Sequence, residues 1–423
     1  MSSYISFSVT VRGSSHVDAG TVCEDSSAHF DDGTIHIAAV ADGHGDPACF
    51  RSGTGAGMAA ETAVEQLRSF AETLPESETE LLFRPRSFRA LTRHLAFNLI
   101  GTWRERVLAH FDSNPPTQEE LAASGQSKKS RLVGMDIDHA YGTTLIACLI
   151  TEKYMLALQR GDGRCVVIRQ SGKIDQPVPW DSRCAGRCMT SLCNDDAVDA
   201  CRFYVSDQRT DPVVAVYVLT DGVEDSYRTM DGVSAFCGKL TSRCVENGVE
   251  SLSAQLEQEL SDFSRRGSRD DVSVAAILDT AAAAAHLESF RLRTDLVIGE
   301  KQAYQAKVRM DSMFLKKRYL AADLDKAKER YEKLKQEIHC LFQSIKEMSI
   351  NLQESRAQHH ILLQDLQEKD EALQAAQKAY EDYSAEYEQA ETEKQKGETL
   401  QRNARERLRQ MGLDDQQKLQ RPE

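Results

Sequence analysis

The chain has 423 residues, a net charge of −14 and 41% hydrophobic residues, which allows a sizeable core and two or three domains. The hydrophobic share excludes a largely disordered chain, and the acidic charge disfavours nucleic-acid or anionic-membrane partners, because both need a positive field. The start of the chain lacks a signal peptide pattern, and no apolar run approaches the roughly 20 residues of a membrane helix. The chain has 11 cysteines, an odd number that cannot all pair in disulfides within one chain. We therefore expect a cytoplasmic protein with reduced thiols and neither a nucleic-acid nor a membrane partner.

Residues 1–280 are predicted to form an α+β domain. Short runs rich in Val, Ile, Leu and Thr end at turn residues, as strands do. The predicted strands are residues 4–11, 35–41, 143–150, 154–159, 165–169, 213–220 and 272–278. The predicted helices are residues 55–74, 88–111 and 249–265, and the polar residues 112–131 are predicted to be an exposed loop. Short strands with long helices predict sheets covered by helices.

Residues 281–411 are predicted to be helical, with a helical linker at 281–300 and a coiled coil at 301–411. Residues 412–423 are predicted to be a disordered tail. No Pro lies between Pro212 and Pro422, and no Gly lies between Gly299 and Gly397, so nothing interrupts a helix. A heptad repeat places apolar or small residues alternately four and three apart. Its members include Leu320, Leu324, Ala327, Tyr331, Leu334, Ile338, Leu341, Ile345, Met348 and Leu352, then Leu362, Leu366, Leu373, Ala376, Tyr380, Tyr383, Tyr387 and Ala390.

This repeat predicts a coiled coil that self-associates or binds a partner helix. At about 1.5 Å per residue, a continuous rod would be on the order of 130 Å long, and we expect it to form a dimer. Ser355, His359 and Lys369 are polar members of the seam, where such residues fix register. The alternative is an antiparallel hairpin that turns within residues 349–360.

Four acidic motifs in the first part end strand-like runs or open turns. They are Glu24-Asp25, Asp42 in Ala-Asp-Gly-His-Gly, Asp221 in Leu-Thr-Asp-Gly, and Asp270-Asp271 in Ser-Arg-Asp-Asp-Val. A strand that ends in Asp-Gly places a carboxylate at the mouth of a sheet, and Gly permits a close backbone approach. Hard cations such as Mg²⁺ and Mn²⁺ prefer oxygen ligands. Two such cations, roughly 3.5–4 Å apart, can activate a bridging hydroxide for attack on a phosphoryl group.

The order of these motifs, with Gly-Thr-Thr at 142–144 and Gly-Asp-Gly-Arg at 161–164 between them, resembles the type 2C metal-dependent serine/threonine protein phosphatases. The resemblance covers residues 5–280, is closest to bacterial members, and implies a central β-sandwich flanked by helices. It also implies a signalling enzyme that hydrolyses phosphoserine or phosphothreonine in a protein substrate, with two Mn²⁺ or Mg²⁺ ions and a third in some members.

The resemblance also implies roles for individual residues. Asp42 would bridge both metals, and the Gly43 carbonyl would bind one of them. The direct ligands of the other metal would be Glu24, Asp221 and Asp270. Asp25 would hold metal-bound water, and Asp162 lies where some members bind the third metal.

His44 would be the general acid, a role that suits imidazole. Thr143 and Thr144 are expected to be structural.

Gly20 departs from the family pattern, because many members carry an arginine there that grips the phosphate. Arg12, His16, Arg51 and Arg164 are the candidates to replace it. Asp46 likewise replaces a common Gly. The missing arginine motivates the alternative of a catalytically weak phosphatase-fold interaction or signalling module, although the retained metal ligands argue against an inactive protein. A two-metal phosphohydrolase that acts on small molecules is a weaker alternative, because the motif order argues against it.

A second candidate site is a group of four cysteines, Cys184, Cys188, Cys193 and Cys201. Zinc sites can use four thiolates, but structural sites usually begin with tighter pairs. We therefore expect free thiols.

Overall fold

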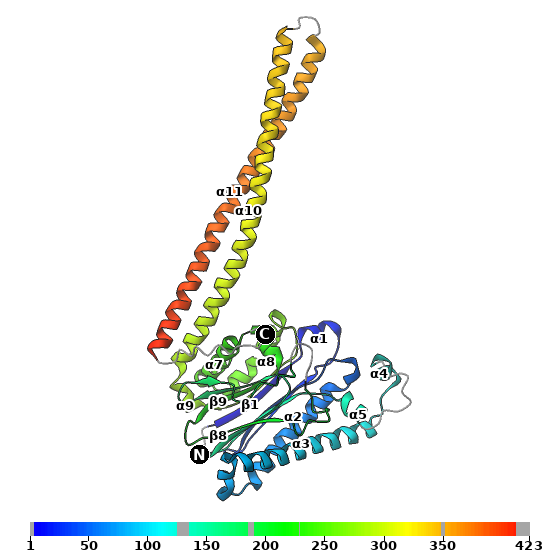
Figure 1. Cartoon of the computed structure of the whole chain (residues 1–423), viewed down its shortest axis with the longest axis vertical. Helices are drawn as coiled ribbons and strands as arrows, with labels where there is room; N and C mark the ends of the chain where they lie inside the picture. The colour runs from blue at the N-terminus through cyan, green and yellow to red at the C-terminus, as the bar shows by residue number, and fades with distance from the viewer. Residues whose placement is uncertain (1–3, 125–134, 185–189, 228, 348–351, 412–423) are drawn as a thin grey trace. The chain divides into compact units, whose positions relative to one another are not determined.

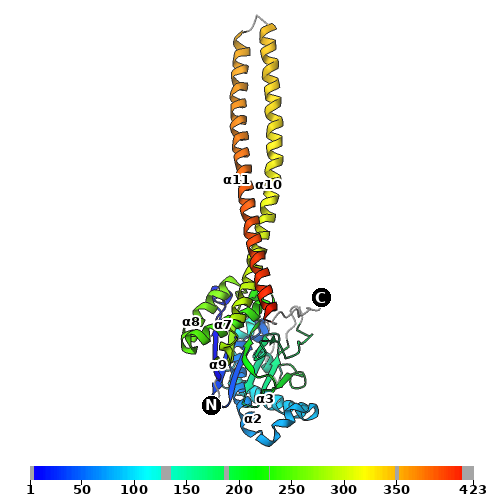
Figure 2. The same ribbon diagram turned by 90° about the vertical axis from the view of Figure 1, so that its left-hand side faces the viewer.

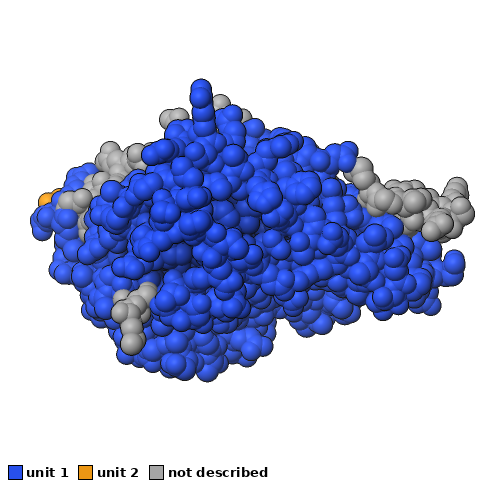
Figure 3. Space-filling model, turned by 90° about the horizontal axis from the view of Figure 1, so that it is seen from below, with its two compact units in different colours: residues 1–294, 407–423 blue, residues 295–406 orange. Residues whose placement is uncertain are grey.

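The computed structural model describes residues 4–124, 135–184, 190–227, 229–347 and 352–411. The chain forms two compact units, residues 1–294 with 407–423 and residues 295–406, which Figure 3 colours separately. The predicted tail at 412–423 lies outside the described residues. Of the helices in the described ranges, none combines the length and apolarity needed to cross a lipid bilayer.

The first unit contains two five-stranded antiparallel sheets. One has the order β1-β10-β9-β6-β7, formed by Tyr4–Val11, Val272–Asp279, Val213–Leu219, Arg164–Arg169 and Ile174–Asp175. The other has the order β2-β3-β4-β5-β8, formed by Asp25–Asp31, His36–Asp42, Leu145–Ile150, Tyr154–Arg160 and Arg202–Asp207. All seven predicted strands are present. Three strands were missed: β2 and β8 because they are polar and only partly buried, and β7 because it has only 2 residues.

The two sheets pack face to face, as the alternation of residues along β3 shows. Ala38 and Val40 belong to the core between the sheets, together with Val216 and Ile277 from the first sheet. Ile37, Ala39 and Ala41 point the other way, into a second core under helices. Successive side chains of a strand point to opposite faces, so one buried strand serves two cores. The predicted β-sandwich flanked by helices is confirmed (Figures 1 and 2).

Helices cover the outer face of each sheet. The second sheet is covered by α2 (Ser52–Thr73) and α3 (Pro85–Ser113), and the first by α7 (Met230–Asn247) and α8 (Val249–Arg266). The shorter helices of this unit are α1 (Ser14–Ala19), η1 (Pro47–Cys49), η2 (Glu76–Phe83), α4 (Gln118–Ala123), α5 (Met135–Ala140), α6 (Asp221–Tyr227) and α9 (Thr280–Ala284). The segment predicted as a loop at 112–131 therefore contains α4, which begins with a capping box between Thr117 and Glu120.

The C-terminal part is a hairpin of two long helices, α10 (Leu287–Glu347) and α11 (Leu352–Gln410). Arg309 pairs with Glu393 at 2.8 Å, and Lys317 donates to Ser384 at 3.1 Å. The ring of Phe342 meets that of His359 at 4.4 Å between centroids. Residue numbers rise along α10 as they fall along α11, so the helices are antiparallel (Figure 2).

The expectation of one continuous rod is therefore wrong, and the hairpin alternative is confirmed. The apolar seam is covered within one chain, because the two helices bury seam residues against each other. The buried seam residues include Ala306, Leu324 and Ile338 of α10 and Ala390 of α11. In the sequence, the break in the apolar seam between Leu352 and Leu362 was the feature that indicated a hairpin. The connection at 348–351 lies outside the described residues.

Candidate functional site

The site begins where a strand of each sheet ends. Asp42 is the last residue of β3, and Asp221 follows β9 and opens α6. Asp25 at the start of β2 is the register partner of Asp42. The charge of Asp221 helps to raise the pKa of Asp42, so the two carboxyl groups lie near each other. The sandwich thus brings together carboxyls that are far apart in sequence.

The backbone around Asp42 is fixed by hydrogen bonds. Its N–H donates to Thr144 Oγ1 at 3.0 Å, and its carbonyl accepts from Thr143 Oγ1 at 2.9 Å. These contacts support the structural role predicted for the two threonines. Gly43 donates its N–H to the Glu24 carbonyl at 3.1 Å, and a Cβ there would lie only 2.6 Å from that oxygen. Only glycine fits this close approach.

Two hydroxyls hold the Glu24-Asp25 pair. Ser52 donates to Glu24 Oε1 at 3.0 Å, and Thr220 donates to Asp25 Oδ2 at 2.8 Å. Sequence reasoning missed both, because a lone Ser or Thr gives no pattern. Their positions follow from the fold, since Ser52 opens α2 and Thr220 ends the run before Asp221.

Asp271 ties the start of the chain to the site. Its carboxylate accepts from the Gly13 N–H at 2.5 Å and from the Glu24 N–H at 2.6 Å. It also contacts His16 Nδ1 at 3.0 Å, while His16 Nε2 lies 3.8 Å from Glu24 Oε2. Asp271 is 3% exposed. It therefore positions Glu24, a role that the acidic motif alone did not reveal.

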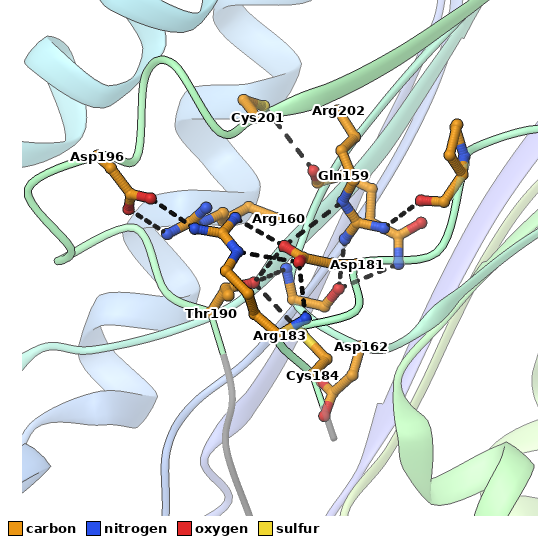
Figure 4. A network of polar contacts seen from close by, with 12 residues as sticks. Gln159, Arg160, Asp162, Asp181, Arg183, Cys184, Thr190, Asp196, Cys201 and Arg202 are labelled. Atoms are coloured by element: carbon orange, nitrogen blue, oxygen red, sulfur yellow. Dashed lines mark hydrogen bonds and ion pairs between the residues drawn. The ribbon is translucent and has the colours of Figure 1, made fainter. Parts of the chain in front are cut away.

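Asp162 lies on a turn that neighbouring side chains hold (Figure 4). Arg202 Nη2 donates to the Gly161 carbonyl at 2.6 Å, and the Gly161 N–H donates to Thr190 Oγ1 at 3.2 Å. Gly161 has a φ of 108°, which favours glycine. Asp162 Oδ1 is buried without a hydrogen-bond partner among the described residues.

Burial and mutual repulsion raise the pKa values of these acids. Burial is the largest cause for each, followed by neighbouring carboxylates for Asp42. For Asp221, burial and then Asp162 raise the pKa to about 7. The pKa is also raised for Glu24, Asp25, Asp162 and Asp270. Such a group is stable when protons or cations neutralise it.

The donor chemistry fits hard divalent cations. Glu24, Asp42, Asp221 and Asp270 supply carboxylate oxygens, and Asp162 has an unpartnered buried oxygen. As they stand, the His, Cys, Asp and Glu side chains of the described ranges form no group of three arranged around one metal position. The negative charges of Asp25 and Asp221 instead lie close enough to Asp42 to raise its pKa.

His44 follows Gly43, and its N–H donates to the Gly142 carbonyl at 3.1 Å. Burial, and then the neighbouring His139, lower the pKa of His44 to about 4. At pH 7 only on the order of one imidazole in a thousand would carry the proton that a general acid must donate. His44 Nδ1 is buried without a partner in the described structure.

The candidates to replace the missing arginine differ in their surroundings. Arg51 binds Glu120 through Nε at 3.0 Å and Tyr141 through Nη1 at 2.9 Å. Arg164 pairs with Glu224. These two guanidiniums are thus engaged by protein groups. His16 contacts Asp271 through Nδ1, while its Nε2 lies 3.8 Å from Glu24 Oε2.

The side chain of Arg12 is exposed. Gly20 itself ends α1 with a φ of 71°, and Asp46 caps η1 by accepting from Ala48 N–H at 2.7 Å.

The cysteines show no common partner in the described residues. Cys193 contacts His139 Nδ1 at 3.6 Å, Cys184 contacts Thr190, and Cys201 contacts the Gln159 carbonyl. All three are free thiols, as expected. Cys188 lies outside the described residues.

The fold and the acidic centre define the class of this protein. A family model described as protein phosphatase 2C matches residues 12–261, more than half of the 423 residues. The chain therefore belongs to the protein phosphatase 2C family. Members of this family are metal-dependent serine/threonine protein phosphatases that use Mn²⁺ or Mg²⁺, so the chain is an enzyme of that class.

Solved structures resemble about two thirds of the chain. The serine/threonine phosphatase Stp1 of Staphylococcus aureus is 16% identical over 66% of this chain and 95% of that chain, with a TM-score of 0.38. PppA, a key regulatory component of T6SS in Pseudomonas aeruginosa, is 15% identical over 65% and 97%, with a TM-score of 0.36.

The catalytic domain of the phosphatase PstP, in complex with 2 manganese ions, is 16% identical over 65% and 97%, with a TM-score of 0.35. No curated protein matches the chain significantly. Membership of the family therefore rests on the family model.

Proposed function

We propose that the chain hydrolyses phosphoserine or phosphothreonine in a protein substrate at a two-metal centre. Glu24, Asp42, Asp221 and Asp270, with the Gly43 carbonyl, would hold the two ions. Asp25 would orient water, and Asp162 would serve a third ion. The observation that carries the proposal is that Asp42 ends β3 and Asp221 follows β9, so strands of both sheets bring their carboxyl groups to one place. When bound, the cations supply positive charge to the phosphoryl oxygens and lower the pKa of the attacking water.

The chain's own groups perform the remaining tasks. Asp271 and Ser52 hold Glu24 from its backbone and its carboxylate, so this ligand is oriented before a cation arrives. His16, 3.8 Å from Glu24 Oε2, is the candidate to contact the substrate phosphate in place of an arginine. His44 would donate a proton to the leaving alkoxide only when a nearby phosphate dianion raises its pKa.

The proposal is tested by activity on p-nitrophenyl phosphate. Purified protein should release phosphate with Mn²⁺ and stop in EDTA. Asp42→Ala should lower the rate at least about a hundredfold, because removing even an outer-shell partner of a metal costs roughly 10–100-fold. Asp325→Ala, an exposed residue of α10, is the matched control. An inactive wild-type protein with bound Mn²⁺ would instead support a catalytically weak signalling module, the alternative that Gly20 favours.

The hairpin would serve association with a second copy of the chain. Its helix α10 carries an exposed apolar stripe in which Tyr304, Val308, Leu315 and Tyr319 are 69%, 50%, 54% and 74% exposed. Their spacing of four, seven and four places them on one helix face. This face points away from the seam, because Ala306 on the seam is 1% exposed.

Charge complementarity supports a second copy as the occupant. The stripe is flanked by exposed cations at Lys301, Lys307, Arg309, Lys316 and Arg318. The facing stretch of α11 has exposed acids at Glu381, Asp382, Glu386, Glu388 and Glu391. The Arg309–Glu393 pair shows that the two stretches lie at one level of the hairpin. In a two-fold dimer, α10 of one copy can therefore meet α11 of the other with opposite charge.

Two further expectations belong to this proposal. The catalytic domain would end with the first unit at residue 294, because Phe290 is 1% exposed and packs in the core of the first sheet. A cytoplasmic location is supported by the free cysteines of the described residues.

A further inference from the structure

The helix α3 carries a stripe of exposed side chains along one side. Arg86, Arg89 and Arg93 form its first half, and Phe97 and Leu108 form its second half. Steps of three, four, four and eleven residues place these five side chains on one side of an α-helix. Phe97 and Leu108 are 64% and 49% exposed. The α3 stripe, defined by these five residues, is therefore basic at one end and apolar at the other.

Most of the positive charge at the start of α3 is not compensated. The guanidiniums of Arg86, Arg89 and the neighbouring Arg84 have no partner among the described residues, whereas Arg93 pairs with Asp199 at 2.8 Å. The first turn of α3 contains no acidic residue. Cations at a helix N-terminus oppose the helix dipole, and like charges three or four residues apart repel each other. These arginines therefore destabilise their own helix, and an acidic ligand would relieve the repulsion.

The basic half of the α3 stripe lies away from the acidic centre. The helix α2 begins at Ser52, which contacts Glu24, and the chain reaches the start of α3 only after the far end of α2 and η2. From there α3 runs back along α2 toward α5 (Figure 1), because Trp103 Nε1 donates to the Gly55 carbonyl at 3.0 Å. The helix between Arg86 and Trp103 is about 25 Å long. The arginines are therefore at the end of α3 that is farther from the metal ligands.

We propose that the α3 stripe is a docking surface for an acidic amphipathic helix of a partner protein. Carboxylates of the partner pair with Arg86 and Arg89, and its apolar side chains cover Phe97 and Leu108. Gly101 lies between these two apolar residues, and a Cβ there would meet no described side chain within 4 Å, which leaves room for a side chain of the partner. The opposite charges guide the encounter and set the register, while the apolar contact supplies affinity.

A protein helix fits the α3 stripe better than a nucleic acid or a lipid surface does. The chain has a net charge of −14, so a long polyanion would be repelled outside the stripe. A phosphate backbone would also leave Phe97 and Leu108 uncovered, whereas an amphipathic helix contacts both halves of the stripe. The inference goes beyond the proposed phosphatase function and does not depend on it, because the surface contains none of the proposed metal ligands.

The test measures the binding of two fluorescent peptides to the full chain by fluorescence anisotropy. Both peptides have about 20 residues of Glu, Leu and Ala in the same amounts. In the patterned peptide Glu and Leu follow a helical repeat, and in the scrambled peptide they do not. The patterned peptide should bind at least about tenfold more tightly, because only its helix presents an acidic and an apolar edge together. Added salt should weaken this binding, because it screens the ion pairs.

Substitutions in the α3 stripe then locate the binding surface. Arg86→Glu with Arg89→Glu should weaken binding of the patterned peptide by about tenfold or more, because two attractions become repulsions. Phe97→Ala should weaken it by roughly three- to tenfold, and Phe97→Leu should weaken it less. Arg265→Glu with Arg266→Glu, the same change of charge at exposed positions of α8, should leave the affinity unchanged.

Charge reversal gives the sharpest result, because general damage to the fold cannot create a new preference. Arg86→Glu with Arg89→Glu should bind a patterned peptide with Lys in place of Glu more tightly than the wild type does. Equal binding of the patterned and scrambled peptides, or an unchanged affinity in this double variant, would overturn the docking surface.

The same double variant separates a protein partner from other anionic partners. Tighter binding of phosphatidylglycerol vesicles or of a polyuridine oligonucleotide than of the patterned peptide, lost in Arg86→Glu with Arg89→Glu, would overturn the assignment to a protein helix. Because the surface lies away from the acidic centre, the double variant should release phosphate from p-nitrophenyl phosphate at the rate of the wild type. Peptide binding is measured without turnover, so a failure of the phosphatase proposal leaves this test unaffected.

Discussion

Asp42 and Asp221 lie beside each other where strands of the two sheets of the sandwich end, and the charge of Asp221 helps to raise the pKa of Asp42. Asp42 ends β3 of one sheet, and Asp221 follows β9 of the other. Two acids meet in this way only if one carries a proton or a cation replaces it. The relationship therefore links the packing of the sheets to the metal dependence of the family.

The first prediction concerns metal affinity. Asp221→Asn and Asp270→Asn each remove one ligand charge and should weaken Mn²⁺ binding by about tenfold or more. Isothermal titration calorimetry measures this change. Asp325→Asn on α10, an exposed carboxylate, should leave the titration unchanged. Unaltered affinity in both ligand variants would remove Asp221 and Asp270 from the metal site.

The second prediction concerns Asp271, which holds the N–H groups of Gly13 and Glu24. Asp271→Ala leaves two buried donors unpaired and should lower the free energy of unfolding by about 2–4 kcal/mol. Urea denaturation measures the loss. Asp271→Asn keeps one acceptor oxygen and should lose less. Equal stability of the wild type and Asp271→Ala would contradict the role assigned to this carboxylate.

The third prediction concerns pH. Hydrogen bonds from Arg183 are the main cause that lowers the pKa of Asp181 to about 2. An acid with a depressed folded-state pKa stabilises the fold above its unfolded value of about 3.9, and this contribution is lost as pH falls toward 2. Asp181→Asn should therefore have a lower free energy of unfolding than the wild type at pH 6, and this difference should become smaller between pH 4 and pH 3. Urea denaturation midpoints of the two proteins at pH 6 and at pH 3 measure the difference in stability. A difference that grows in acid would be inconsistent with the ion pair.

The fourth prediction concerns association through the hairpin. The double change Val308→Glu and Leu315→Glu places charge in the exposed stripe and should convert a dimer into a monomer at micromolar concentration. Multi-angle light scattering reports the mass. Ala375→Glu with Gln377→Glu adds the same charge at exposed positions of α11 and should leave the dimer intact. A monomeric wild-type chain would refute self-association.

Much of the fold followed from local patterns. Val213–Leu219 is a continuous apolar run, Tyr154–Arg160 begins with five such residues, and both strands are fully buried, so their prediction needed no partner. Arg202–Asp207 was missed because it is an edge strand whose residues are all half-buried. α7 was missed as well, since its glycines Gly232 and Gly238 weaken a helical pattern.

The site was predictable only in part. Motif order predicted Asp42, Asp221 and Asp270 as metal ligands, because each ends, follows or precedes a buried strand. It could not reveal that Asp271 orients Glu24 or that Thr220 binds Asp25, since these contacts join segments that only the folded sheets bring together. The hairpin was the less favoured alternative for the same reason. A heptad seam specifies a partner helix but not the molecule that supplies it.

The most direct measurement of the central claim is the Mn²⁺ dependence of phosphate release from a phosphothreonine peptide, with Asp42→Ala as the control. We expect turnover by the wild type that rises with Mn²⁺ and stops in EDTA, and a loss of at least about a hundredfold in Asp42→Ala. Turnover that is indifferent to Mn²⁺, or that survives Asp42→Ala unchanged, would contradict the account of the acidic centre.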